Sequence, residues 1–107
     1  MRLVDMAIEI KNYRDSDMAS VLAIASFGPI PLDLPITSLL GMRKFVALCD
    51  GKVIGFGAID VQISCTACAY ATVVALCAKN NDAASALRLY LEAYAKNCGA
   101  TVIRNRL

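Results

Sequence analysis

A buried strand, a short polar turn and an amphipathic helix near the C-terminus constrain the fold of this chain most. Residues 69–78 are almost wholly apolar, which is typical of a strand covered on both faces. A polar turn follows, from Lys79 to Asp82. Gly99 predicts the end of the next helix, and residues 100–103 predict a last strand. Apolar residues at intervals of three and four mark the inner face of that helix: Ala84, Leu87, Leu91, Tyr94 and Cys98.

A β-hairpin is expected in the middle of the chain. Residues 44–49 and 52–61 have strand-like compositions, and the Asp50-Gly51 pair between them favours a type I′ turn. Gly55 and Gly57 interrupt the second strand. They indicate a bulge or the close approach of another element.

The N-terminal part predicts a strand followed by a helix. Residues 8–13 alternate between apolar and polar, which is the period of a half-buried strand. Residues 14–17 provide helix-start chemistry, and a short amphipathic helix follows through Met18, Val21, Leu22 and Ala25. Residues 28–35 contain all three prolines and predict a stiff loop, and residues 36–42 predict one or two helical turns.

The element order is therefore β-α-(α)-β-β-β-α-β. We expect an α+β fold in which a mixed, mostly antiparallel five-stranded sheet carries helices on both faces. No internal repeat or linker interrupts the chain, so residues 1–107 are expected to form a single domain.

Composition narrows the classes of function. The hydrophobic fraction of 58% is high for 107 residues, which favours contact with another protein, although an alanine-rich core would also raise this fraction. The net charge of +2 comes from scattered cations without interleaved aromatic residues, so nucleic-acid binding is not expected. We find no signal peptide and no apolar stretch long enough to span a membrane, and we expect a cytoplasmic protein.

Cysteine and histidine usage excludes several kinds of site. The Cys65 and Cys68 pair would need two further ligands to bind zinc, and the chain has no histidine, so no metal site is expected. The pair also lies in a strand-like run, away from the helix N-terminus that activates a redox thiol. Without histidine, neither Ser-His-Asp nor Cys-His nucleophiles can form within this chain.

The turn at residues 79–84 has the position of an anion site but not its composition. A turn between a strand and a helix start presents free backbone N–H groups and the positive end of the helix dipole. A phosphate cradle there needs glycines so that the backbone can approach the anion, and this turn has none. Asp82 adds a negative charge, and its simplest structural role is the helix N-cap.

The element order and four local segments resemble the GNAT superfamily of acetyl-CoA-dependent N-acetyltransferases. Residues 45–58 carry the most specific likeness, to the hairpin of the family. Residues 13–22, 84–99 and 100–104 are similar to its first strand-to-helix passage, its cofactor-side helix and the strand after it. The likeness spans most of the chain, which ends where the family continues, so we expect a truncated GNAT-like domain.

The resemblance implies a set of acetyl-CoA contacts. Residues on the fourth strand would give main-chain hydrogen bonds to pantetheine: Val73, Val74, Ala75 and Leu76. The family's diphosphate motif reads Gln/Arg-x-x-Gly-x-Gly/Ala, and counting back from Gly99 places Lys79, Asp82 and Ala84 on its three defined positions. Lys79 and the amides of Ala83 and Ala84 would then hold phosphate. Asp82 stands where the motif has its first glycine and would repel the diphosphate.

The resemblance also shows what is missing. The family often places a catalytic carboxylate on or near the fourth strand and a tyrosine beyond the fifth. Residues 66–78 contain no carboxylate. Tyr70 is a weak substitute, expected instead to pack between sheet and helix. The fifth strand would leave an open sheet edge at Ala100–Arg106, where a partner strand could add.

Two functions follow from these observations. The first is a non-catalytic GNAT-like protein without a cofactor, acting as a structural or interaction subunit of a larger assembly, such as an oligomer or a phage virion component. The alternative is a minimal N-acetyltransferase that binds acetyl-CoA and is completed by oligomerisation. A small regulatory binder that uses the cleft for another ligand also stays open.

Overall fold

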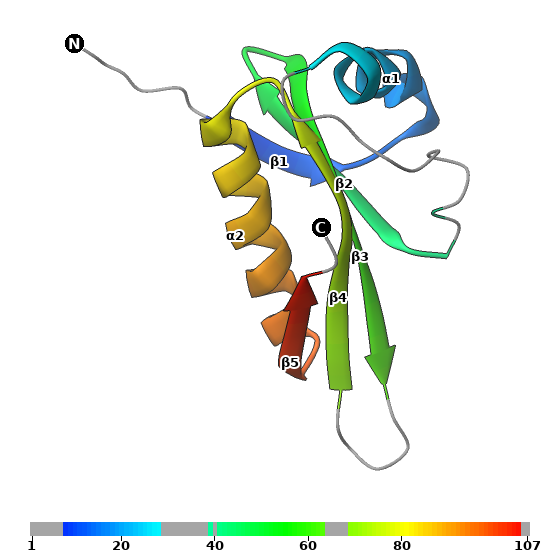
Figure 1. Ribbon diagram of the computed structural model, residues 1–107, viewed down its shortest axis with the longest axis vertical. Helices are drawn as coiled ribbons and strands as arrows, with labels where there is room; N and C mark the ends of the chain where they lie inside the picture. The colour runs from blue at the N-terminus through cyan, green and yellow to red at the C-terminus, as the bar shows by residue number, and fades with distance from the viewer. Residues whose placement is uncertain (1–7, 29–38, 40, 64–68, 106–107) are drawn as a thin grey trace, which may run out of the picture.

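Five strands lie side by side in the order in which they occur in the sequence (Figure 1). The computed structural model describes residues 8–28, 39, 41–63 and 69–105. The strands are β1 (Ile8–Asn12), β2 (Arg43–Cys49), β3 (Lys52–Ile63), β4 (Ala69–Ala78) and β5 (Ala100–Asn105). Strands β1 to β4 pair antiparallel, whereas β5 is parallel to β4. The expected mixed, mostly antiparallel sheet is confirmed.

Two helices cover opposite faces of this sheet. A 3₁₀ turn, η1 (Asp15–Asp17), leads into α1 (Met18–Phe27), which packs on one face near the C-terminal end of β4. Helix α2 (Asn81–Asn97) connects β4 to the parallel strand β5 across the other face, as a parallel connection requires. The sheet therefore has one core beneath each helix.

The β2–β3 hairpin turns at Asp50 and Gly51, as expected. Their φ angles of 53° and 76° are both positive, which is the type I′ geometry that suits the twist of a hairpin. Cys49 and Lys52 pair directly across the turn. A register shift in this hairpin gives β3 one extra residue, Ile54, between the partners of Ala47 and Leu48.

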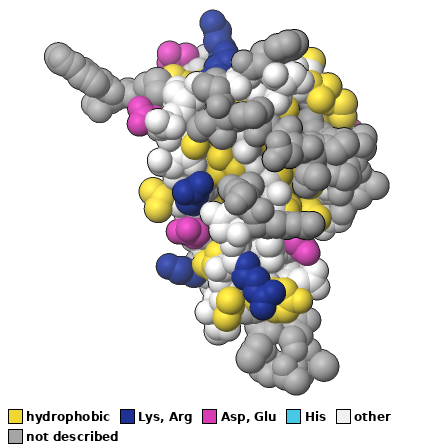
Figure 2. Space-filling view, in the orientation of Figure 1, with side chains coloured by type: hydrophobic (Ala, Val, Ile, Leu, Met, Phe, Trp, Pro, Cys, Tyr) yellow, Lys and Arg dark blue, Asp and Glu magenta, His cyan; other side chains and the backbone are white. Residues whose placement is uncertain are grey.

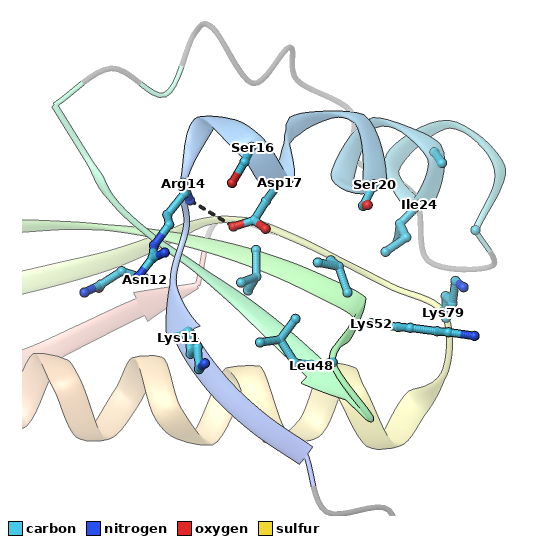
Figure 3. Close-up of a pocket in the computed structure, with 15 residues that line it drawn as sticks. Lys11, Asn12, Arg14, Ser16, Asp17, Ser20, Ile24, Leu48, Lys52 and Lys79 are labelled. Carbon is cyan, nitrogen blue, oxygen red and sulfur yellow. Dashed lines mark hydrogen bonds between the residues drawn. The ribbon is translucent and has the colours of Figure 1, made fainter.

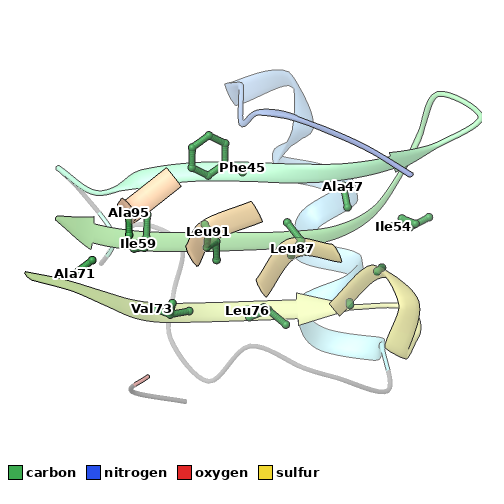
Figure 4. Close-up of a cluster of buried hydrophobic side chains, with 12 residues drawn as sticks. Phe45, Ala47, Ile54, Ile59, Ala71, Val73, Leu76, Leu87, Leu91 and Ala95 are labelled. Carbon is green, nitrogen blue, oxygen red and sulfur yellow. The ribbon is translucent and has the colours of Figure 1, made fainter. Parts of the chain in front are cut away.

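Helix α2 packs on β3 at two glycines (Figure 4). A Cβ on Gly55 would lie 2.8 Å from Leu87 Cδ1, and one on Gly57 would lie 3.0 Å from Leu91 Cδ1. The expected close approach is confirmed. The buried face of the helix is rotated slightly from the expected one. Its buried residues are Ala83, Leu87, Leu91 and Ala95. Of the expected face, Ala84 and Tyr94 are only half-buried and Cys98 is exposed.

Helix α1 closes the other core through Val21 and Ile24, which are buried against the sheet. The strands contribute Val46, Phe56, Val74 and Cys77 to this core. Leu22 and Met18 of the same helix are exposed. This helix therefore buries only part of its apolar surface.

Some expectations lie outside the described residues. One is the Cys65 and Cys68 pair. Another is most of the stretch 36–42, where helical turns were expected; within it, Leu39 is described and is buried. Of the helices that the structure describes, neither α1 nor α2 has the length and apolar content needed to span a membrane.

Candidate functional site

Strands β4 and β5 pair along only half of β4. Their register runs from Ala69 opposite Ala100 to Val73 opposite Asn105. A register shift with β3 makes Val74 an extra residue on β4, so Val74 and Ala75 both pack in the α1-side core. Beyond Val73, no described strand pairs with β4 on the side away from β3. The edge of β4 from Val74 to Ala78 therefore has no partner strand among the described residues, and we call this unpaired stretch of β4 the β4–β5 cleft.

The four residues assigned to pantetheine lie at this cleft. Val73 is the last residue of β4 that pairs with β5. Val74, Ala75 and Leu76 follow it, and all four side chains are buried, so any contact with a ligand in the cleft would come from their backbone groups. Their role as cofactor contacts stays a prediction.

The N-terminus of α2 is capped by its own sequence. The Oδ1 atom of Asn80 accepts a hydrogen bond from the Ala83 N–H at 2.8 Å, and the Asn80 carbonyl accepts one from the Ala84 N–H at 3.2 Å. The expectation that Asp82 is the N-cap is wrong, because the helix begins earlier and Asn80 has the extended backbone of a capping residue. The two amides assigned to phosphate are thus already hydrogen-bonded.

Asp82 lies exposed in the first turn of α2. A carboxylate in this position interacts favourably with the helix dipole, so it stabilises the helix and weakens the attraction of its N-terminus for an external anion. The N–H that the Asn80 side chain occupies and the charge of Asp82 therefore both oppose phosphate binding here.

Lys79 extends the β3–β4 ladder by donating its backbone N–H to the Ile54 carbonyl at 2.9 Å. Its side chain is exposed and lines a groove on the α1 side of the sheet, near Lys52 (Figure 3). Lys79 was assigned to phosphate together with Ala83 and Ala84. The structure places its side chain at this groove.

Tyr70 does not pack between sheet and helix, so that expectation is wrong. Its side chain is 38% exposed, and the Arg104 guanidinium carbon lies 5.3 Å from the centre of its ring. Tyr70 pairs with Val102 in the closed half of the β4–β5 ladder, four residues before Val74. At the rise of an extended strand it is about 13 Å from the start of the cleft, which is too far for a general acid acting there.

Asp60 is a carboxylate on the sheet itself, a place that the sequence did not single out. Asp60 lies in β3 opposite Thr72 of β4, and its Oδ2 accepts a hydrogen bond from Gln62 Nε2 at 2.8 Å. Like Tyr70, it belongs to the half of the sheet away from the cleft. Because side chains alternate between the two faces along β3, the sequence could have predicted that Asp60 lies on the α1 side.

Cys77 is fully buried in the α1-side core. Burial raises the pKa of its thiol from about 9 to about 11, and a backbone hydrogen bond from Phe56 offsets part of that rise. The thiol stays neutral at physiological pH and is not an activated nucleophile. Among the described residues, no three metal-ligating side chains gather at one point.

Comparison with solved structures identifies the architecture. A GNAT family acetyltransferase from Staphylococcus aureus superimposes with a TM-score of 0.72 at 13% identity, over 95% of this chain and 87% of that chain. A ribosomal-protein-alanine N-acetyltransferase from Brucella melitensis gives a TM-score of 0.71 at 18% identity, over 94% of this chain and 80% of that chain. This chain has the GNAT fold.

One similar GNAT structure contains a ligand. An aminoglycoside N-acetyltransferase in complex with CoA superimposes with a TM-score of 0.70 at 13% identity, over 100% of this chain and 81% of that chain. No protein-family model and no curated protein matches the sequence. At these identities the likeness concerns the fold alone.

Proposed function

We propose that this chain is a GNAT-fold protein without acetyltransferase activity that acts as an interaction subunit of a larger assembly. The carrying observation is the α2 N-terminus, where the Asn80 side chain occupies the Ala83 N–H and Asp82 adds a negative charge. The residues around the β4–β5 cleft could receive a pantetheine chain, but those at the helix N-terminus do not fit a diphosphate. A virion component is one form of this proposal.

The absence of suitable catalytic groups at the cleft supports this proposal. Tyr70 lies away from the cleft, and the Cys77 thiol is buried in its neutral form. Among the described residues of β4, no side chain can act as a general base at physiological pH.

Calorimetric titration with acetyl-CoA tests the loss of cofactor binding. We expect no measurable binding by the unmodified chain at micromolar concentrations. The double variant Asn80→Gly, Asp82→Gly frees the Ala83 N–H and removes the charge, so it should bind more tightly by at least about tenfold, or about 1.4 kcal/mol. Micromolar binding by the unmodified chain would contradict the proposal and favour the acetyltransferase, the alternative that the open β4–β5 cleft supports.

For the interaction role we propose that β5 pairs with β5 of a second copy. Val102 is 50% exposed on this edge strand, next to the exposed Tyr70. In an antiparallel register that places Val102 opposite its own copy, Arg104 faces Ala100, so no like charges meet. Figure 2 shows exposed apolar side chains interspersed with both charges on the side that it displays.

Light scattering over a range of concentrations tests this association. We expect a dimer that dissociates in Val102→Lys, because two lysines would then face each other at the centre of the pairing. Leu89→Lys is the matched control, since Leu89 is exposed on α2 and does not lie on this edge. A monomer at every concentration, or equal dissociation of both variants, would contradict pairing through β5.

A further inference from the structure

A groove separates α1 from β1 and from the β2–β3 turn (Figure 3). It encloses a cavity of about 930 Å³, which is enough for a small organic molecule. We call it the α1 groove. Its described lining comes from four parts of the chain: β1, the η1–α1 stretch, the β2–β3 hairpin, and Lys79 directly after β4.

The floor of the α1 groove is apolar. Val46 and Leu48 of β2 and Val53 of β3 line it from the sheet, and Ile24 lines it from α1. Ala23 and Gly28 continue the helical wall with small residues. None of the described lining residues is aromatic, so this part of the chain offers the groove no stacking surface for bases.

The rim of the α1 groove carries four cations. Lys11, Arg14, Lys52 and Lys79 all line it, whereas Asp17 is the one carboxylate among the lining residues that the structure describes. The Asp17 Oδ2 atom accepts a hydrogen bond from the Arg14 backbone N–H at 3.0 Å, so Asp17 is already engaged in holding the start of the helix. Among the described lining residues, cations therefore outnumber carboxylates by four to one.

The cations lie at both ends of the groove. Figure 3 shows Lys52 and Lys79 near the C-terminal end of α1 and Arg14 near its N-terminal end. Lys11 pairs with Glu9 at 3.8 Å, but both side chains are more than half exposed, so this pair is weak and can be exchanged for a stronger anion. Ser16 and Ser20 add hydroxyl groups along the helical wall.

We propose that the α1 groove is a binding site for a small organic anion with an apolar body, of the phosphate-monoester class. The apolar floor suits the body, and Lys52 and Lys79 at one end of the groove suit a doubly charged phosphate. Lys11 and Arg14 add to the positive potential of the rim. This site lies on the opposite face of the sheet from α2, and it does not depend on the proposed loss of acetyl-CoA binding.

The probe is 1-naphthyl phosphate, compared with 1-naphthol and with inorganic phosphate. We expect the phosphate ester to bind with a dissociation constant of about 1 mM or below, and each half-probe to bind at least about tenfold more weakly. Amide signals of Ser20, Gly51 and Lys52 should shift in ¹⁵N-resolved NMR spectra of the chain during the titration. Affinity should fall as salt is added.

Lys52→Gln and Lys11→Gln should each weaken binding of 1-naphthyl phosphate by about threefold to tenfold, because each removes one rim cation. Lys96→Gln is the matched control, since Lys96 is exposed in the last turn of α2. It should leave the affinity unchanged.

Three results would overturn the proposal. They are equal affinity for 1-naphthol, an equal loss in Lys96→Gln, and the absence of any shift at the groove residues at saturating ester. Shifts confined to residues 81–84 would instead place the phosphate at α2, which would contradict the proposed function as well. Neither Lys52 nor Lys11 belongs to the predicted acetyl-CoA contacts, so their variants separate the two proposals.

Discussion

The two faces of the sheet are closed in different ways. On the α2 face, Leu87 and Leu91 fit against Gly55 and Gly57, and the helix lies close to the strand backbone. On the α1 face, the helix buries Val21 and Ile24 but leaves Leu22 and Met18 exposed and a groove at its side. At Gly55 and Gly57 the long helix lies directly against the strand, whereas the short helix on the other face leaves a groove next to it.

The faces also differ in the charged and capping groups that they present to an anion. The α2 N-terminus is an anion site by topology, yet Asn80 and Asp82 satisfy it from within the helix. The α1 groove has no anion motif in its sequence, yet three lysines and Arg14 line it. The sequence motif therefore points to the α2 N-terminus as the place for an anion, whereas the charges that the fold assembles point to the α1 groove.

Removing the side chain of Leu87 tests the close packing of the α2 face. Leu87→Ala should lower the free energy of unfolding by about 3 kcal/mol, because the side chain is fully buried and the cavity cannot collapse against Gly55. Leu22→Ala on α1 is the matched control and should cost less than about 1 kcal/mol, because Leu22 is 46% exposed. Chemical denaturation measures both, and similar losses would show that the faces are packed alike.

The thiol of Cys77 tests the dryness of the α1-side core beneath the groove. Its pKa is raised to about 11 when folded, so the unfolded chain loses this proton first, near pH 9. Stability from this group is complete below pH 9 and is lost as the pH rises through 11, by up to about 3 kcal/mol in total. The measurement is the difference in unfolding free energy between the unmodified chain and Cys77→Ala. A difference that does not change with pH would mean that water reaches the thiol.

Asn80→Ala tests the internal cap of α2. The variant leaves the Ala83 N–H without its acceptor, so the free energy of unfolding should fall by about 1 kcal/mol. Asn81→Ala is the control, because Asn81 is exposed and does not cap the helix. An equal effect of the two substitutions would disprove the assigned cap.

Tyr13→Phe tests whether the buried Tyr13 hydroxyl on the α1 face lacks a hydrogen-bond partner. The Tyr13 hydroxyl is buried and has no hydrogen-bond partner in the structure, and its ring packs edge-on against Phe56. Removing the oxygen should raise the unfolding free energy by up to about 1 kcal/mol. On the α2 face, burial raises the pKa of Tyr94 and hydrogen bonding with Cys98 raises it further, so Tyr94→Phe should destabilise the chain instead. Destabilisation by Tyr13→Phe would show that its hydroxyl has a partner in solution.

Local signals in the sequence predicted much of the fold. The Asp50-Gly51 turn was predictable because few residues accept two successive positive φ angles. The strand at residues 69–78 was predicted at its observed bounds from its apolar run. The extra residue Val74 was not predicted, because a bulge within a uniformly apolar strand leaves no pattern in the sequence.

The candidate sites were harder to predict. Asn80 and Asp82 are both good capping residues, and only the backbone conformation decides between them. The cations of the α1 groove are scattered in the sequence, from residue 11 to residue 79, and only the fold places them around one groove. The pantetheine contacts at Val73–Leu76 and the pairing of β5 stay predictions.

Titration of the chain with inorganic pyrophosphate, followed at each backbone amide by NMR, tests the central contrast most directly. We predict that the amide signals of Asn81, Asp82, Ala83 and Ala84 stay in place, because Asn80 caps this turn and Asp82 repels anions. Signals of Gly51 and Lys52 at the α1 groove should move in the same titration. Early, saturable movement of the Ala83 and Ala84 signals would contradict the account, because it would show that the α2 N-terminus still binds diphosphate.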